Sequence, residues 1–158
     1  MQIIIDTREQ EALTFQMIDG VSVKSECLKV GDYAARHKDG QMDSTVIERK
    51  SIGDLFSSFT GDNYDREKEK IKRAKELGIR LVLAVESPAI EVRKGHKYWK
   101  DGEWHEVQKT GISQVRQIMT LLRRGDFAEV WWCASRTDMA FQIQEYFLTA
   151  ERANLKER

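Results

Sequence analysis

Four charged residues in the first third of the chain have the types and spacing for metal-assisted chemistry: Asp6, Asp32, Glu48 and Lys50. Side chains alternate between the two faces of a β-strand, so Glu48 and Lys50 project from one face and Arg49 from the other. A hairpin turn at Asp39-Gly40 would lie eight residues after Asp32, and Glu48 follows eight residues after Gly40. The spacing therefore predicts that the two carboxylates lie opposite each other, or nearly so, with an ammonium beside them.

This arrangement indicates a divalent cation and a phosphate substrate. Two adjacent carboxylates repel each other unless a cation joins them. Oxygen ligands suit Mg²⁺ or Mn²⁺, and Mg²⁺ commonly uses few protein carboxylates. The ammonium of Lys50 can hold an attacking water or neutralise charge on the phosphate. The pattern fits phosphodiester hydrolysis. Asp54 is predicted either to orient Lys50 or Arg49, or to cap the following helix.

Each of these residues also has a plainer interpretation. Asp6 and Asp32 are common turn formers, and residues 48–50 could form a solvated strand end. The basic residues of one helix are interpreted as a solvated face rather than as DNA contacts: Lys68, Lys70, Lys72, Arg73 and Lys75. His96 and His105 lack partners at ligand spacing, so a zinc site is not expected. The combination of the four charged residues, rather than any one of them, favours chemistry.

The hydrophobic periodicity predicts an α/β domain with a mixed central sheet and helices on both faces. Strands are expected at residues 2–6, 21–28, 44–50, 80–85 and 128–133, with a further one starting at Gly31. Helices are expected at residues 52–59, 65–77, 110–124 and 136–151, with a break at 61–63. A turn is expected at 37–40, and an irregular or hairpin insertion at 89–108 with its turn at 100–102.

Length and composition restrict the class of protein. The 158 residues suffice for one domain, and no apolar run approaches the roughly 18 residues of a membrane span. Without a secretory signal, the expected location is cytoplasmic, with Cys27 and Cys133 as reduced core residues. Residues 63–124 carry 15 bases and 9 acids, whereas residues 1–62 carry 7 bases and 11 acids. A phosphate-binding surface beside a carboxylate cluster would give this distribution, although solvated basic helices would too.

Three stretches of the sequence together resemble one known family. They are Ile3-Ile4-Ile5-Asp6-Thr7-Arg8-Glu9, Val30-Gly31-Asp32-Tyr33 and Val46-Ile47-Glu48-Arg49-Lys50-Ser51-Ile52-Gly53-Asp54-Leu55. The pattern of Gly-Asp, a variable gap and Glu-Arg-Lys-x-x-x-Asp resembles the nuclease domain of the XPF/Mus structure-specific endonucleases. Residues 81–86 also resemble that family's strand ending in a glutamate. The likeness is clear over about residues 1–86 and extends further only as element order.

The resemblance implies a restriction-endonuclease-like core, a Mg²⁺ or Mn²⁺ requirement, and DNA cleavage near branched, flap or fork junctions. Asp32 and Glu48 would be the main metal ligands, with Asp6 as a further or water-mediated ligand, and Lys50 would assist the water. The other implied site residues orient the site or hold phosphate: Arg8, Glu9, Arg49, Asp54 and, as an auxiliary, Arg66.

Two departures from the family pattern affect the expected substrate and partners. The nuclease domain is expected over residues 1–153, before a frayed tail at 154–158, and no helix-hairpin-helix domain follows it. The insertion carries Lys97, Trp99 and Lys100, and is interpreted equally well as a DNA-contacting element or as a surface hairpin packing its own aromatics. The resemblance also implies a homodimer, for which apolar residues in 130–132 and on the last helix would be suited. The alternative to an enzyme is a catalytically inactive DNA-binding scaffold.

Overall fold

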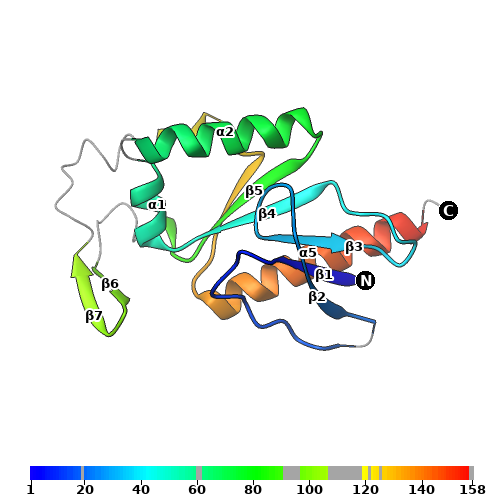
Figure 1. Ribbon diagram of the computed structural model, residues 1–158. Helices are drawn as coiled ribbons and strands as arrows, with labels where there is room; N and C mark the ends of the chain where they lie inside the picture. Colours follow the sequence, from blue (N-terminus) through cyan, green and yellow to red (C-terminus); the bar gives the residue numbers. More distant parts are fainter. Residues whose placement is uncertain are drawn as a thin grey trace.

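A six-stranded mixed β-sheet forms the centre of the computed structural model, in the order β2-β1-β3-β4-β5-β8 (Figure 1). Its strands are β1 (Gln2–Asp6), β2 (Ser22–Glu26), β3 (Tyr33–Arg36), β4 (Thr45–Lys50), β5 (Arg80–Val85) and β8 (Glu129–Trp132). β3 runs antiparallel to both β1 and β4, and the other neighbours are parallel. The structure describes residues 1–18, 20–59, 62–90, 97–106, 119–120, 122–124 and 126–156. The predicted mixed sheet is confirmed.

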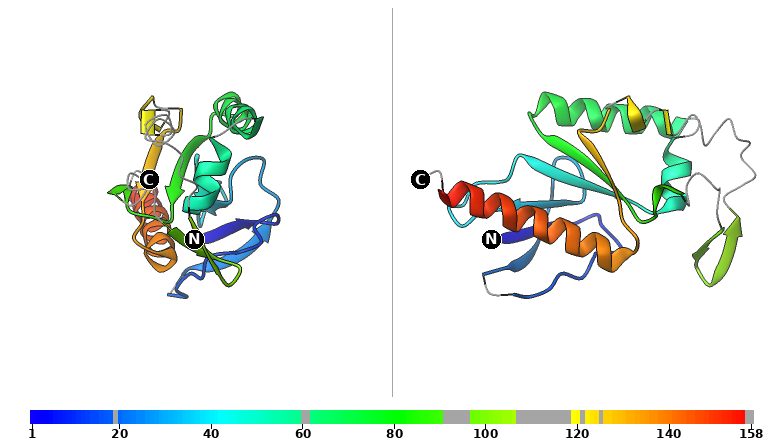
Figure 2. Two further views of the ribbon diagram at one scale, coloured as in Figure 1. Left: turned by 90° about the vertical axis from the view of Figure 1, so that its left-hand side faces the viewer. Right: turned by 180° about the vertical axis from the view of Figure 1, so that it is seen from behind.

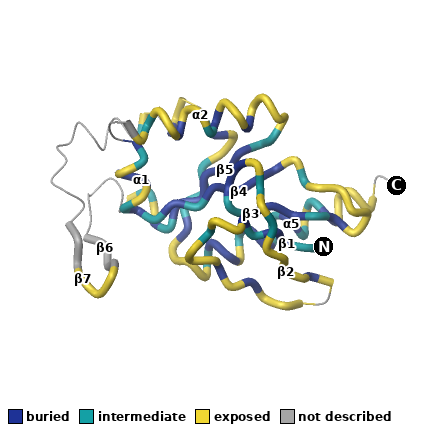
Figure 3. Tube along the Cα trace, viewed as in Figure 1, coloured by how far each residue is buried: buried dark blue, intermediate teal, exposed yellow. Residues whose placement is uncertain are grey.

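Helices cover both faces of this sheet (Figures 1 and 2). α1 (Ile52–Ser58) and α2 (Asp62–Glu76) lie on one face, and α5 (Arg136–Lys156) lies on the other. The period-two alternation of β5 explains the two layers, because Leu83 packs in the core under α1 and α2, whereas Val82 packs with α5. β4 and β5 are therefore mostly buried on both sides (Figure 3).

The bounds of two helices differ from the prediction. α2 begins at Asp62, so the expected break at 61–63 is wrong for the last two of these residues, and Asn63 donates to the Ser57 carbonyl at 3.2 Å. Gly78 caps the end of this helix, because its φ of +67° allows the Ile79 N–H to reach the Ala74 carbonyl at 2.9 Å. α5 continues to Lys156, so residues 154–156 are helical rather than frayed.

Other sequence interpretations need correction at the edges of the fold. The strand predicted at 128–133 is β8, the outer strand of the sheet, so Trp131 and Trp132 are only half-buried. Cys133 is a buried free thiol as expected, whereas Cys27 is exposed and does not belong to the core. The helix predicted to end at Leu77 ends at Glu76, and Leu77, which follows the last helical residue, is 41% exposed. The predicted helix at 110–124 lies mostly outside the described residues.

A buried histidine fixes the β3–β4 turn to the last helix. His37 Nδ1 lies 2.6 Å from Glu151 Oε2, and its Nε2 lies 3.1 Å from Asp43 Oδ2. Both contacts are hydrogen bonds at once only when the imidazole is doubly protonated, because ionised carboxylates only accept. In the turn itself, Gly40 has a φ of +87° and its N–H donates to the His37 carbonyl, which confirms the predicted hairpin turn.

The insertion contains a second, two-stranded sheet. β6 (Lys97–Lys100) and β7 (Glu103–Glu106) pair antiparallel with Trp99 opposite Trp104. Asp101 and Gly102 both have positive φ, at 53° and 83°, as a two-residue hairpin turn requires. Residues 97–106 of the insertion are thus a hairpin rather than irregular, and whether it contacts DNA stays a prediction. Among the described residues, no helix is long and apolar enough to cross a membrane.

Candidate active site

The backbone brings Asp32 and Glu48 together where β3 begins. The antiparallel register pairs Tyr33 with Ile47, which places Asp32 opposite Glu48. The Asp32 N–H donates to the Ile47 carbonyl at 2.8 Å, and the Arg49 N–H donates to Asp32 Oδ2 at 2.7 Å. This arrangement agrees with the pairing predicted from the hairpin spacing.

Gly31 is required where the chain enters this site. Its φ is +75°, a region that L side chains rarely adopt. A Cβ at this position would also lie 2.4 Å from Val46 Cγ1 and 3.1 Å from the Ile47 carbonyl oxygen. The Gly-Asp pair of the motif thus has a steric reason, since the close approach of Gly31 to β4 sets the position of Asp32.

Lys50 lies on the same face of β4 as Glu48 and is buried. Its Nζ is 3.2 Å from Glu48 Oε1 and 2.9 Å from Glu67 Oε1. Lys70 Nζ, from α2, also contacts Glu48 Oε1, at 2.5 Å. The sequence analysis missed Glu67 and wrongly assigned Lys70 to a solvated face. Their spacing of three residues on one face of α2 was visible in the sequence, but only the packing of α2 on β4 reveals where that face points.

Burial and like charge control the ionisation of this group. Burial, followed by the nearby charge of Glu48, raises the pKa of Asp32 to about 7. Burial would lower the pKa of Lys50, but the charges of Glu48 and Glu67 outweigh it, so that pKa is raised and Lys50 is an ammonium. The neighbouring positive charge is therefore not enough to balance both Asp32 and Glu48, and this favours the binding of an added cation.

The raised pKa gives a stability prediction for the metal-free protein. The Asp32 carboxyl has a higher pKa folded than unfolded, so wild-type stability falls as pH rises from about 4 to about 7. Asp32→Asn keeps an acceptor for the Arg49 N–H and removes this penalty. We expect it to stabilise the protein at pH 8 by about 2 kcal/mol. This is roughly half of the free energy that corresponds to the shift in the Asp32 pKa, because Asp32 is partly exposed. Urea unfolding from pH 4 to 8 tests this, and a difference that does not grow with pH would contradict it.

Asp6 and Arg8 form a separate pair at the end of β1. Asp6 is buried, and its oxygens accept from Arg8 Nε at 2.6 Å, Arg8 Nη2 at 3.1 Å and the Leu28 N–H at 2.6 Å. Burial would raise the pKa of Asp6, but these hydrogen bonds outweigh it and the pKa is lowered. Both Asp6 oxygens are thus occupied, and its role as a further metal ligand stays a prediction.

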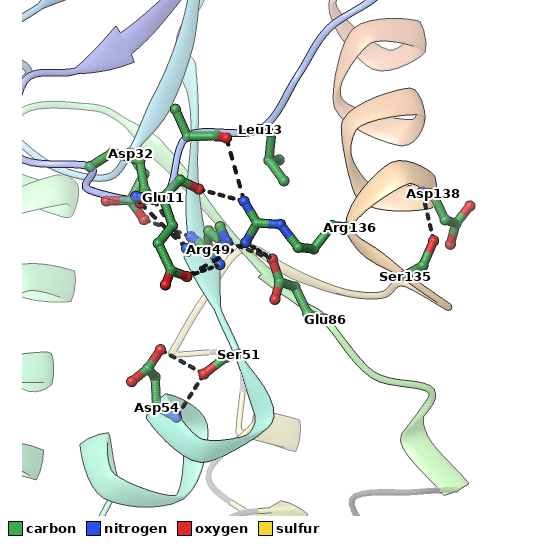
Figure 4. Close-up of polar contacts among 12 residues, drawn as sticks. Glu11, Leu13, Asp32, Arg49, Ser51, Asp54, Glu86, Ser135, Arg136 and Asp138 are labelled. Carbon is green, nitrogen blue, oxygen red and sulfur yellow. Dashed lines mark hydrogen bonds and ion pairs between the residues drawn. The ribbon is translucent and has the colours of Figure 1, made fainter. Parts of the chain in front are cut away.

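Arg49 points to the other face of β4, where it holds a buried ion-pair network (Figure 4). Its Nε is 2.6 Å from Glu86 Oε1, and its Nη1 is 3.4 Å from Glu9. Arg136, at the start of α5, contacts the same Glu86 oxygen at 2.9 Å and the Glu11 carbonyl at 2.6 Å. These carboxylates raise the pKa of Arg49 despite its burial. The network ties β4, β5 and α5 together behind the site, and Arg136 had no sequence pattern to reveal it.

Ser51, rather than Asp54, is the N-cap of α1, and Asp54 lies in the first turn, where its N–H is capped. Its N–H donates to Ser51 Oγ at 3.1 Å, and the Ser51 hydroxyl donates to Asp54 Oδ2 at 2.6 Å (Figure 4). These contacts fix the direction in which the chain leaves Lys50.

A cleft of about 680 Å³ opens over the carboxylates. Asp6, Asp32 and Glu48 line it. The other charged lining residues are five cations and two acids: Arg8, Lys29, Lys70, Lys72, Arg73, Glu69 and Glu76. The interpretation of the α2 bases as a solvated face is wrong only for Lys70, which contacts Glu48, since Lys72 and Arg73 are exposed. The proposed DNA contacts of Arg66, which is exposed, and of Lys97, Trp99 and Lys100, whose side chains lie outside the described part, stay predictions.

The donor set fits Mg²⁺ or Mn²⁺ better than zinc. Within the described ranges, no three or more His, Cys, Asp or Glu side chains come together as a ligand group, so an ion here would have only the two carboxylates of Asp32 and Glu48. In the same part of the chain, Asp32 Oδ1 and Glu48 Oε2 take part in no hydrogen bond. Two carboxylates with free oxygens facing one cleft suit an ion that completes its shell with water and phosphate oxygens.

Comparisons with known proteins agree with this fold and site. The family model described as the ERCC4 domain matches residues 5–146. The chain therefore belongs to the ERCC4 domain family, a family of nuclease domains, as the motif resemblance predicted. No curated protein matches the chain.

Solved structures show the same fold. XPF from Aeropyrum pernix is 19% identical with a TM-score of 0.61, over 96% of this chain and 65% of that chain. The same protein in a complex with DNA gives 19% identity and a TM-score of 0.60, over 99% of this chain and 66% of that one. The chain thus spans about two thirds of the length of these XPF chains, and it has the XPF nuclease fold.

Proposed function

We propose that the protein is a Mg²⁺- or Mn²⁺-dependent DNA endonuclease that hydrolyses phosphodiester bonds at branched, flap or fork DNA. The observation that carries this proposal is the pairing of Asp32 with Glu48 beside Lys50, at a cleft whose lining includes five cationic side chains. Membership of the ERCC4 domain family supports the same reaction class. A binding scaffold would not require Asp32, Glu48 and Lys50 together at one site.

The proposed roles follow from the contacts of each side chain. Asp32 Oδ1 and Glu48 Oε2 would hold the divalent cation, which when bound activates water and neutralises charge on the phosphate. Lys50, fixed between Glu48 and Glu67, keeps an ammonium next to the reacting phosphate. Arg49 orients Asp32 through its backbone N–H, and its buried side chain prevents β4 from shifting.

The DNA backbone would lie along the cleft. Arg8 and Lys29 from one wall, with Lys72 and Arg73 from α2, provide cations on both sides of the carboxylates. Phosphates that flank the scissile one would neutralise these cations, which gives sequence-independent binding that weakens with salt. The complex of Aeropyrum pernix XPF with DNA supports DNA as the substrate.

Cleavage of labelled flap, fork and linear duplex DNA, each with and without Mg²⁺, tests the proposed function. We expect Mg²⁺-dependent products from flap or fork DNA and little cleavage of linear duplex. Equal cleavage of all three would refute the junction preference. Binding of every substrate without cleavage of any would refute the enzyme and favour the scaffold.

We also propose a homodimer, through a smaller surface than the sequence suggested. Met139, Ile143 and Phe147 of α5 are fully buried within the chain, so they are not available to a partner. Phe141, 56% exposed, and the outer edge of β8 remain. Sedimentation at micromolar concentration should give a dimer that Phe141→Glu dissociates, and a wild-type monomer would refute the proposal.

A further inference from the structure

Two glutamates and two lysines form a closed group beside the proposed metal site: Glu48, Lys50, Glu67 and Lys70. Glu48 Oε1 contacts Lys70 at 2.5 Å and Lys50 at 3.2 Å. Glu67 Oε1 contacts Lys50 at 2.9 Å and Lys70 at 3.3 Å. Both lysines therefore share one oxygen of each glutamate, and the group carries no net charge.

The second carboxylate oxygen of Glu67, Oε2, takes no part in these contacts. Glu67 is 6% exposed, and its Oε2 is buried without a hydrogen-bond partner among the described residues. Leaving a buried carboxylate oxygen unpaired is unfavourable, so native structures rarely keep one without a reason. A second state of the site in which Oε2 receives a donor would explain it.

Lys70 is the donor that can move. Its side chain is 30% exposed, whereas the Lys50 side chain is 9% exposed and held between two carboxylates. Lys70 follows Glu67 by three residues on α2, so the two side chains are neighbours on one helix face. Rotation of the Lys70 side chain can therefore exchange Glu48 Oε1 for Glu67 Oε2 without movement of the backbone.

We propose that Lys70 is the counter-ion of Glu48 in the metal-free protein and transfers to Glu67 Oε2 when a divalent cation binds Glu48. The inference rests on the proposed function only in requiring that the Asp32–Glu48 pair binds such a cation. The ammonium and the cation compete for one carboxylate and repel each other, and the unpaired oxygen of Glu67 receives the displaced ammonium. Lys70 and Glu67 are positioning residues that set the metal affinity.

Mn²⁺ binding to the full chain, measured by electron paramagnetic resonance, tests the transfer. Lys70→Gln removes the competitor and should tighten Mn²⁺ binding about tenfold. Glu67→Gln removes the receiving carboxylate and should weaken binding roughly tenfold. Lys72→Gln is the matched control, because Lys72 lines the same cleft and has the same charge but makes no contact with Glu48 in the described structure. It should change Mn²⁺ affinity less than about twofold, as expected for a screened charge.

The outcomes separate this inference from the proposed function. Equal effects of Lys70→Gln and Lys72→Gln, or weaker binding by Lys70→Gln, would overturn the transfer but leave the metal site intact. Absence of Mn²⁺ binding by the wild type would overturn both. A crystal structure of the wild type with Mn²⁺ needs no variant, and it should place Lys70 Nζ within hydrogen-bond distance of Glu67 Oε2. Lys70 still on Glu48 in that structure would refute the transfer.

Discussion

Glu48→Gln should lower the rate of DNA cleavage about 10³-fold or more, which corresponds to about 4 kcal/mol of transition-state stabilisation. The variant keeps the size of the side chain but removes the charge that would hold the cation. Asp32→Asn should have a loss of the same order, since Asp32 lies opposite Glu48 across the β3–β4 pair. Single-turnover cleavage at saturating enzyme measures the effect on the chemical step without a contribution from binding.

DNA affinity distinguishes a catalytic loss from a folding defect in these variants. Each substitution removes a negative charge from a cleft that would hold phosphates, so DNA binding should be unchanged or tighter. Glu129→Gln is the control. Glu129 on β8 forms an exposed ion pair with Arg80 on β5, so this variant should cleave at the wild-type rate within a few-fold. A parallel loss of binding and cleavage, or full activity in either site variant, would contradict the assignment.

Arg49→Met should destabilise the protein by about 3–5 kcal/mol, the usual cost of removing one member of a buried ion pair. The Arg49 side chain is 8% exposed, as is that of Glu9, and the Glu86 side chain is 12% exposed. Methionine fills much of the same space but leaves Glu9 without a cation, while Arg136 still contacts Glu86. Equilibrium unfolding in urea gives the change in the free energy of unfolding.

Arg80→Met is the matched control for this prediction. Arg80 also forms a short ion pair, at 2.6 Å to Glu129, but the two side chains are 39% and 48% exposed. Exposed pairs contribute at most about 1 kcal/mol. Similar losses in the two variants would show that the Arg49 network contributes no more than a surface pair, and our account of how β4 is held would be wrong.

The sequence was sufficient to predict the part of the site that lies within one hairpin. Alternation along a strand fixes Glu48 and Lys50 on one face, and the turn at Gly40 fixes Asp32 opposite Glu48, so both follow from local geometry. Glu67, Lys70 and Arg136 could not be placed in this way. Their roles depend on how α2 and α5 pack on the sheet. Until that packing is known, a charged residue on a helix is best interpreted as solvated.

The fold shows the same division between local and long-range information. The strands 2–6 and 80–85 were predicted with their observed bounds, because their apolar runs end in charged or polar residues. The position of β8 in the sheet was not predicted, because an apolar run such as 130–132 does not reveal whether a strand is central or at the edge. Half-burial of Trp131 and Trp132 follows from that position rather than from composition.

The most direct test of the metal-dependent nuclease centre compares the wild type with the Asp32→Asn/Glu48→Gln double variant, purified side by side, on one labelled flap substrate. The extent of cleavage is measured across a Mg²⁺ titration. We expect saturable, Mg²⁺-dependent product formation by the wild type and none by the double variant, although both bind the flap DNA. Cleavage that is equal in the two proteins, or that persists without Mg²⁺, would contradict the claim that this carboxylate pair is the active site.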